Sequence, residues 1–439
     1  MSAQGPKGVY VGGPQVAGSH ERQHGRRVLK ALRLGLVTGA ADDDPSAIGT
    51  YAAAGASLGY SFLWTAPVTL PMMFGVVYLS AKLGQVAGQG LFALIRSHYP
   101  RWIFYPALIG VLIGNTFEAA SNIGGMAAAL NVLAPVPFAW VVIGTALAIL
   151  ALQIWGSYLQ IRNIFRWLAL SLLAYVGAAF LARPELLPTL KGTFLPTIQF
   201  NKEFLTLLVA VIGTTLSAYL YTWQSNQEVE EKITLGRRRL SERKGASEKE
   251  LEHSRRDILL GMLFSNLIMY FIILSTAATL HKAVQTEITT AADAAQALRP
   301  LAGDAASLLF ALGVVGVGFL AVPVMTTGAA YDLAQVAGWK HGLNVKPGEA
   351  KKFYAAIAAF TFMAVGINFL GLNPMKMLVW SGIVQGFSTP PLMLLIMFLT
   401  NSPAIMGNKV NSRAVNLLGW ATTAAIFAAT IGLVITWFI

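Results

Sequence analysis

Long apolar runs, each about the length of a membrane-crossing helix, dominate the chain. Crossing about 30 Å of hydrocarbon takes roughly 20 apolar residues. The pattern predicts eleven spans, at 29–59, 61–82, 103–133, 136–155, 164–182, 204–226, 257–280, 303–336, 353–371, 377–400 and 414–438. Of the 439 residues, 55% are hydrophobic and only 12% are charged, whereas soluble domains carry about 25% charged residues. The pattern therefore predicts an all-α polytopic membrane protein.

Lysine and arginine fall mainly on one side of these spans. With the N-terminus in the cytoplasm, 26 of the 32 Lys and Arg residues lie in inside segments, as the positive-inside rule requires. We therefore expect a multi-pass protein of the cell (inner) membrane with an extracytoplasmic C-terminus. This placement accounts for the net charge of +12 without nucleic acid. The absence of cysteine excludes disulfides and thiolate sites.

The order of the spans suggests two halves of five helices followed by one more helix. We expect a cytoplasmic tail at 1–28, a first transmembrane repeat at 29–200 and a second at 201–400, with helix 11 within 401–439. The second repeat would include a charged cytoplasmic loop at 227–257. Inverted repeats of this kind place a discontinuous helix at matching depth in each half.

The first span carries three consecutive acids, Asp42, Asp43 and Asp44, before Pro45. One Asp at the centre of a bilayer costs about 3 kcal/mol or more, so such residues usually face a polar cavity or an ion. Proline has no N–H and disfavours helix at the residue before it, which predicts a break here. An N-cap role explains one carboxylate well and three hardly at all. We therefore expect a cation site, with Asp44 as its first ligand.

The sixth span carries small and hydroxylated residues from Gly213 to Ser217. Such residues weaken a helix through backbone freedom and through side chains that compete for carbonyl groups. They also serve as polar contacts between membrane helices. The pattern alone leaves both interpretations open.

Residues 35–47, which read GLVTGAADDDPSA, and the Ala54–Tyr60 run resemble the first span of the NRAMP divalent-metal transporters. Ile123-Gly124 and the stretch from Gly213 to Gln224 fall in register with spans 3 and 6 of that family. The resemblance implies a LeuT-type fold of two inverted five-helix repeats, in which the unwound parts of helices 1 and 6 hold the metal.

The resemblance also implies the site residues. The metal-binding Asp of the family falls on Asp44, and its carbonyl donors fall on Ala41 and Thr214. Its asparagine and methionine ligands fall on Ala47 and Ser217, with Asp43 as an additional ligand candidate. The expected surrounding and pathway residues are Asp42, Tyr219, Gln224, Glu118 and Gln385.

The two substituted ligand positions indicate a hard cation. Losing the thioether at Ser217 removes a soft donor that favours transition metals. Mg²⁺ is bound through one or two carboxylates and keeps several waters, for which the short side chains of Ala47 and Ser217 leave room. Simple helix packing explains two small residues equally well. The pattern resembles the NRAMP-related magnesium transporters, and we expect import of partly hydrated Mg²⁺, and of Mn²⁺ as well, by a monomer in the bilayer without a cofactor.

The drive for transport depends on groups that could carry protons. All six histidines fall in predicted loops, so no imidazole is expected at membrane depth. Glu118 keeps an acid of the family's proton route, whereas Ser121 has lost one. Uncoupled, voltage-driven uptake is therefore favoured, and a proton-coupled Mn²⁺ or transition-metal transporter is the alternative. A sodium-coupled symporter and an intramembrane aspartyl protease using Asp332 are more remote hypotheses.

Overall fold

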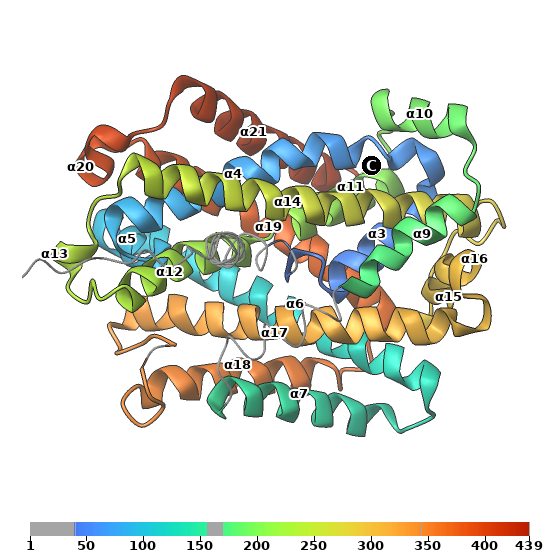
Figure 1. Cartoon of the computed structure of the whole chain (residues 1–439), viewed down its shortest axis with the longest axis horizontal. Helices are drawn as coiled ribbons and strands as arrows, with labels where there is room; N and C mark the ends of the chain where they lie inside the picture. Colours follow the sequence, from blue (N-terminus) through green and yellow to red (C-terminus); the bar gives the residue numbers. More distant parts are fainter. Residues whose placement is uncertain (1–38, 40, 156–169, 344, 439) are drawn as a thin grey trace, which may run out of the picture.

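The computed structural model describes residues 39, 41–155, 170–343 and 345–438, and these residues form helices joined by short loops (Figure 1). The α-helices are α3 (Pro45–Leu58), α4 (Thr65–Ala87), α5 (Leu91–His98), α6 (Arg101–Leu133), α7 (Phe138–Trp155), α9 (Leu173–Leu181), α10 (Leu186–Phe194), α11 (Lys202–Thr215), α12 (Ala218–Thr234), α13 (Leu240–Arg243), α14 (Glu248–Thr276), α15 (Ala291–Ala295), α16 (Arg299–Ala302), α17 (Ala306–Ala337), α18 (Lys351–Ile367), α19 (Pro374–Thr400), α20 (Pro403–Met406) and α21 (Arg413–Ile435).

Within these described ranges, eight helices are long and apolar enough to cross a membrane. The three other predicted spans have plain reasons for not being among them. The span at 353–371 corresponds to α18, which has 17 residues. The spans at 29–59 and 164–182 begin outside the described residues, as does the predicted tail at 1–28. Their described parts are α3 and α9.

Two spans are interrupted at their centres. Asp44 is extended, and α3 begins at Pro45, as the missing proline N–H predicts. In the sixth span α11 ends at Thr215, and α12 begins at Ala218 after a two-residue gap. The question that the sequence left open is therefore answered by a break at Leu216 and Ser217.

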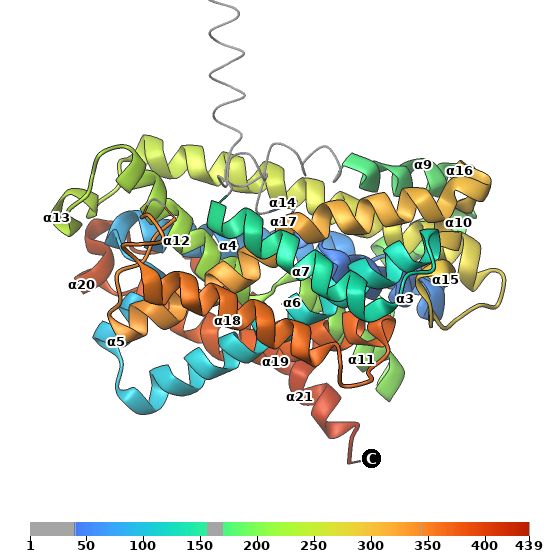
Figure 2. The ribbon, with the colours of Figure 1, turned by 90° about the horizontal axis from the view of Figure 1, so that it is seen from below.

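The long helices α6 and α17 pack against each other through the middle of the bundle (Figure 1). The helices α7 and α18 cover them on one side, and α4 and α14 pair with each other on the opposite side (Figures 1 and 2). The central helix α19 contacts α6, α11 and α3. Gly213 permits the close approach of α11, because a Cβ there would overlap the backbone of α19 at Gly382. Both broken spans therefore pack against the same central helices.

Short elements mark the two ends of the bundle. At one end lie α5, α13 and α20, which we call the α13 end; α10, α15 and α16 lie at the other (Figure 1). The loop predicted at 227–257 is shorter than expected, since α12 runs to Thr234 and α14 begins at Glu248. By the charge distribution along the chain, the α13 end is the predicted cytoplasmic face.

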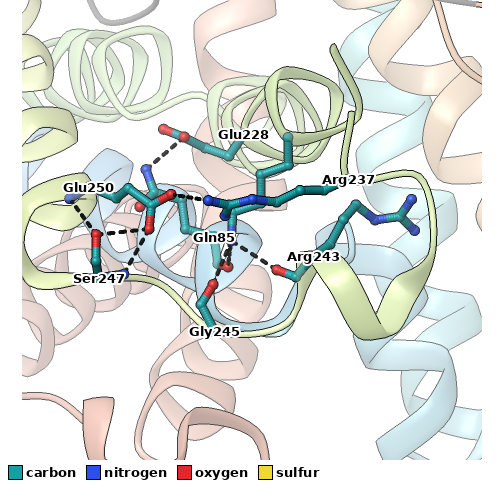
Figure 3. Close-up of polar contacts among 8 residues, drawn as sticks. Gln85, Glu228, Arg237, Arg243, Gly245, Ser247 and Glu250 are labelled. Atoms are coloured by element: carbon teal, nitrogen blue, oxygen red, sulfur yellow. Dashed lines mark hydrogen bonds and ion pairs between the residues drawn. The ribbon is translucent and has the colours of Figure 1, made fainter. Parts of the chain in front are cut away.

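The loop between α12 and α14 is docked onto the end of α4. The buried Lys232 ammonium donates to the carbonyl oxygens of Gln85 at 2.5 Å, Arg243 at 2.8 Å and Gly245 at 2.6 Å. Figure 3 shows these carbonyl groups together, beside the ion pair of 3.0 Å between Arg237 and Glu250. Gly245 N–H also donates to the Val86 carbonyl at 2.8 Å. The loop is therefore held as part of the folded bundle.

Candidate metal site

Asp44 lies at the break in the first span and caps α3. Its Oδ1 accepts from the Ala47 N–H and from the Ser46 hydroxyl, each at 2.7 Å. The carboxylate therefore lies at the N-terminus of α3, where the free N–H groups and the helix dipole stabilise negative charge. The side chains of Asp44 and Ala47 are fully buried, which places a charged group at the centre of the bundle.

A side chain that the sequence analysis did not assign, Asn122 on α6, joins Asp44 from the other side. Asn122 Nδ2 donates to Asp44 Oδ2 at 3.0 Å, and its Oδ1 accepts from Ser46 N–H at 2.8 Å. Ala47 has no side-chain amide, and Asn122 supplies one beside Asp44 instead. The spacing from Glu118 to Asn122 is four residues, which puts both on one helix face and could have indicated this role.

The break in the sixth span brings Thr214 and Ser217 to the same place. The hydroxyl oxygens of Thr214 and Ser46 lie 3.3 Å apart, so α11 meets the start of α3. Ser217 Oγ lies 2.9 Å from the carbonyl oxygens of Gly213 and Thr214 and 3.3 Å from Glu118 Oε1. Three helices thus contribute oxygen atoms to one buried cluster.

Glu118 on α6 connects this cluster to α19. Its Oε1 lies 3.2 Å from the Ser46 hydroxyl, and its Oε2 accepts from Gln385 Nε2 at 2.7 Å. Gln385 Oε1 in turn accepts from the N–H of Ala218, the first residue of α12, at 3.2 Å. Gln385, one of the expected pathway residues, therefore lies directly beside the break in span 6.

Ala41 and Tyr219 meet across the two broken spans. The Tyr219 hydroxyl donates to the Ala41 carbonyl oxygen at 3.0 Å. This carbonyl, a predicted metal donor, is therefore hydrogen-bonded by Tyr219 in this structure. An ion that takes the Ala41 oxygen as a ligand would compete with this tyrosine.

Asp42 and Asp43 turn toward α14 instead of α3. Both lie near the hydroxyl of Ser265, with distances of 2.7 Å to Asp42 Oδ2 and 3.1 Å to Asp43 Oδ1. One hydroxyl proton cannot serve both carboxylates at once. Asp42 Oδ1 and Asp43 Oδ2 are buried without a hydrogen-bond partner among the described residues. These acids form a second acidic group next to Asp44.

Acceptors outnumber protons throughout this cluster. The single hydroxyl proton of Ser46 faces both Asp44 and Glu118, and Ser217 and Ser265 are shared in the same way. The cluster holds four buried carboxylates, those of Asp42, Asp43, Asp44 and Glu118. In the described part of the chain, none of them forms an ion pair with Lys, Arg or His. Buried charge is costly unless it is paired, hydrogen-bonded or bound to metal. The arrangement therefore favours a cation.

One expected pathway residue, the Asp332 of the protease hypothesis and the helical histidines have other contacts. Gln224, two turns along α12 from Ser217, donates to Glu228 Oε1 at 2.9 Å. Asp332 on α17 lies beside Thr222 and Asn226 of α12. The expectation that all histidines lie in loops is wrong: three are helical, although near helix ends, namely His98, His253 and His281. His20 and His24 lie outside the described residues.

A thioether also reaches the site, contrary to the expectation of hard donors alone. Asn122 Nδ2 donates to Met325 Sδ of α17 at 3.3 Å as well as to Asp44. Across the residues that the structure describes, no three His, Cys, Asp or Glu side chains are placed to hold a metal together. An ion here would therefore bind Asp44 together with hydroxyl, carbonyl, amide or thioether groups, as oxygen-rich broken helices allow.

Comparisons with known proteins give the family. The Nramp profile, described as natural resistance-associated macrophage protein-like, matches residues 35–436. The divalent metal cation transporter MntH of Deinococcus radiodurans is 27% identical over 415 residues, covering 92% of this chain and 89% of that protein. MntH of Klebsiella pneumoniae is 27% identical over 390 residues, covering 87% and 88%.

Solved structures show the same fold. A crystal structure of the Eremococcus coleocola manganese transporter, in complex with an aromatic bis-isothiourea substituted compound, covers 97% of this chain and 88% of its own, with a TM-score of 0.69 and 18% identity. The inward-facing conformation of Mhp1 covers 92% and 90%, with a TM-score of 0.52 and 12% identity. The chain thus has the LeuT-type architecture expected from its sequence. It belongs to the Nramp family and is a multi-pass membrane transporter of divalent metal cations.

Proposed function

We propose that this protein imports Mg²⁺, and Mn²⁺ as well, as partly hydrated ions by alternating access. The observation that carries the proposal is the buried carboxylate of Asp44, which shares the single hydroxyl proton of Ser46 with Glu118 and lies beside the Thr214 hydroxyl through that same Ser46 side chain. Mg²⁺ prefers oxygen ligands and keeps several of its waters. We expect the small side chains of Ala47 and Ser217 to leave room for water beside Asp44 when the ion binds.

In this proposal the metal binds between the breaks of spans 1 and 6. Asp44 supplies the charge, while Thr214, Ser217 and the Ala41 carbonyl supply neutral oxygens. Asp43 is an additional ligand, and Asp42 is a neighbouring acid. The α13 end faces the cytoplasm, so that a membrane potential negative inside drives the ion inward by about 2.3 kcal/mol per charge per 100 mV. No proton needs to accompany it.

A second candidate is proton-coupled transport of Mn²⁺ or another transition metal. It is favoured by Glu118, which shares the Ser46 hydroxyl with Asp44 and is placed to exchange a proton as the metal binds. The names of the compared relatives also favour manganese. Assignment to the magnesium branch of the family stays a prediction.

Uptake into proteoliposomes separates the two candidates. Vesicles with a potential negative inside would receive Mg²⁺ or Mn²⁺ from outside, while dyes report internal metal and internal pH. We expect both ions to enter with an unchanged internal pH. Acidification that requires the metal would favour proton coupling. If Mn²⁺ entered while Mg²⁺ neither entered nor competed with Mn²⁺ uptake, the magnesium proposal would be excluded. Protein-free vesicles and the Asp44→Ala variant are the controls.

The protease hypothesis is wrong, because the family consists of transporters and the chain is not an enzyme. Asp332 lies on α17 beside Thr222 and Asn226, about two turns from Met325. Its place between α12 and α17 fits a contact between the two helices toward the α13 end.

A further inference from the structure

Met325 lies where a thioether can reach the candidate metal site from an unexpected helix. It is fully buried in α17, and its sulfur accepts a hydrogen bond of 3.3 Å from Asn122 Nδ2. The same nitrogen donates to Asp44 Oδ2 at 3.0 Å. One amide group therefore stands between the carboxylate and the sulfur.

The two hydrogens of this amide occupy a position that suits a cation. An amide NH₂ group is a pair of donors in one plane, and here its nitrogen lies within hydrogen-bonding distance of both an oxygen and a sulfur. With roughly 120° between two donors on an sp² nitrogen, the distances to Asn122 place Asp44 Oδ2 and Met325 Sδ about 5 to 6 Å apart. Both acceptors thus point toward one small region.

A metal ion could bridge these two acceptors after a small movement. Metal–oxygen distances of about 2.1 Å and metal–sulfur distances of about 2.3 Å or more place the two ligand atoms about 4.5 Å apart when they lie on opposite sides of the ion, and about 3 Å apart when they lie at a right angle. The approach needed is about 1 Å in the first arrangement and about 2 Å in the second, and methionine has three rotatable bonds with which to make it. Asn122 would then release its contacts with both acceptors.

We propose that Met325 is a specificity-determining ligand of the transported ion. This inference rests on the proposed function, because it takes the site at Asp44 as the place of transport. The thioether of Met325 favours Mn²⁺ and softer ions over Mg²⁺, because sulfur donors bind soft and transition metals better than hard ones. Met325 lies on α17, which is the eighth span. It would supply the soft donor that Ser217 lacks on the sixth span.

A neighbouring methionine provides a matched control. Met126 lies on α6 one turn beyond Asn122 and is also fully buried. Its sulfur packs against Gly318 of α17, two turns from Met325. The substitutions Met325→Leu and Met126→Leu therefore remove the same atom from the same helix pair, and only the first removes it from Asn122.

X-ray absorption of bound metal tests the proposal without transport. Purified protein in detergent would be loaded with Cd²⁺, a soft ion with a clear sulfur signature, and with Mn²⁺. We expect a sulfur neighbour in the wild-type protein and in Met126→Leu, and only oxygen or nitrogen neighbours in Met325→Leu. A wild-type spectrum without sulfur would overturn the proposal even if no variant folded.

Equilibrium binding gives the magnitude. Calorimetry should show at least about tenfold weaker binding of Cd²⁺ and Mn²⁺ to Met325→Leu, because even groups that only support a metal ligand are worth 10- to 100-fold, with Mg²⁺ binding unchanged. Met325→Gln, which places an oxygen at this position, should shift preference toward Mg²⁺. If Met325→Leu lost affinity for Cd²⁺, Mn²⁺ and Mg²⁺ by the same factor, Met325 would have no role in specificity. A wild-type protein that binds Cd²⁺ through sulfur but transports neither Mg²⁺ nor Mn²⁺ would refute the proposed function alone.

Discussion

Two buried charged regions of this protein are built in opposite ways. Around Asp44, four carboxylates share a few hydroxyl protons and have no ion pair with a basic side chain in the described ranges. At the α13 end, the Lys232 ammonium donates to three carbonyl oxygens, one for each of its N–H groups (Figure 3). In the described ranges, no basic side chain pairs with the carboxylates of the first region. In the second region, every N–H donor of the Lys232 ammonium has an acceptor within the protein.

The difference distinguishes a site for a transported ion from a structural contact. Buried charge without partners costs several kcal/mol, so an incomplete cluster survives selection where a ligand completes it. Lys232 needs no ligand, because the backbone of the loop and the end of α4 supply its acceptors. Substitutions around Asp44 should therefore change metal transport, whereas substitutions around Lys232 should change stability.

The largest expected effect is on transport at Asp44. Asp44→Ala removes the carboxylate at the α3 break and should reduce metal uptake by more than about 100-fold, since even groups that only support a metal ligand are worth 10- to 100-fold. Uptake of Mn²⁺ and Mg²⁺ into proteoliposomes measures the change. The control is Asp304→Ala, which replaces an exposed acid near α16, at the end opposite the α13 end. This variant should transport normally. Near-normal uptake by Asp44→Ala would remove Asp44 from the site.

The next effect is on stability at Lys232. Lys232→Met keeps most of the side-chain volume but leaves three carbonyl groups without their donor, at about 1 to 3 kcal/mol for each group that stays buried. We expect a Tm lower by several degrees, with metal binding within about twofold of the wild type because the change lies far from the metal ligands. Lys249→Met, at an exposed lysine of α14, should leave the Tm unchanged. Loss of metal binding without loss of stability would contradict the comparison.

A smaller effect is expected from adding a sulfur at the sixth-span break. Ser217→Met introduces a thioether beside Thr214 and Glu118, so the ratio of Mn²⁺ to Mg²⁺ affinity should rise about tenfold, since thioethers select against hard ions. Competition between the two ions in uptake assays measures this ratio. Ser217→Ala removes the hydroxyl without adding sulfur and should not raise it. An unchanged ratio in a folded Ser217→Met protein would show that this side chain does not touch the ion.

The main elements were predictable because membrane helices have a strong signal. The bilayer demands apolar runs of fixed length, and the first break follows from Pro45, whereas the small, hydroxylated residues of the sixth span left the second break open. The motif around Asp44 pointed to the right family. The docked loop was not predictable, because carbonyl groups around Lys232 come from α4 and from the loop itself, and backbone acceptors leave no trace in sequence.

The sequence by itself determined the helical membrane fold, the first break and the central position of Asp44, since all three depend on local composition and backbone chemistry. Only the tertiary structure placed Asn122 against that carboxylate, Gln385 against Glu118 and Met325 against Asn122, because the three residues belong to other helices whose rotation and depth are set by packing. Hydrogen-bond and metal-ligand distances of a few ångströms depend on that packing, which no residue pattern within a single span can encode.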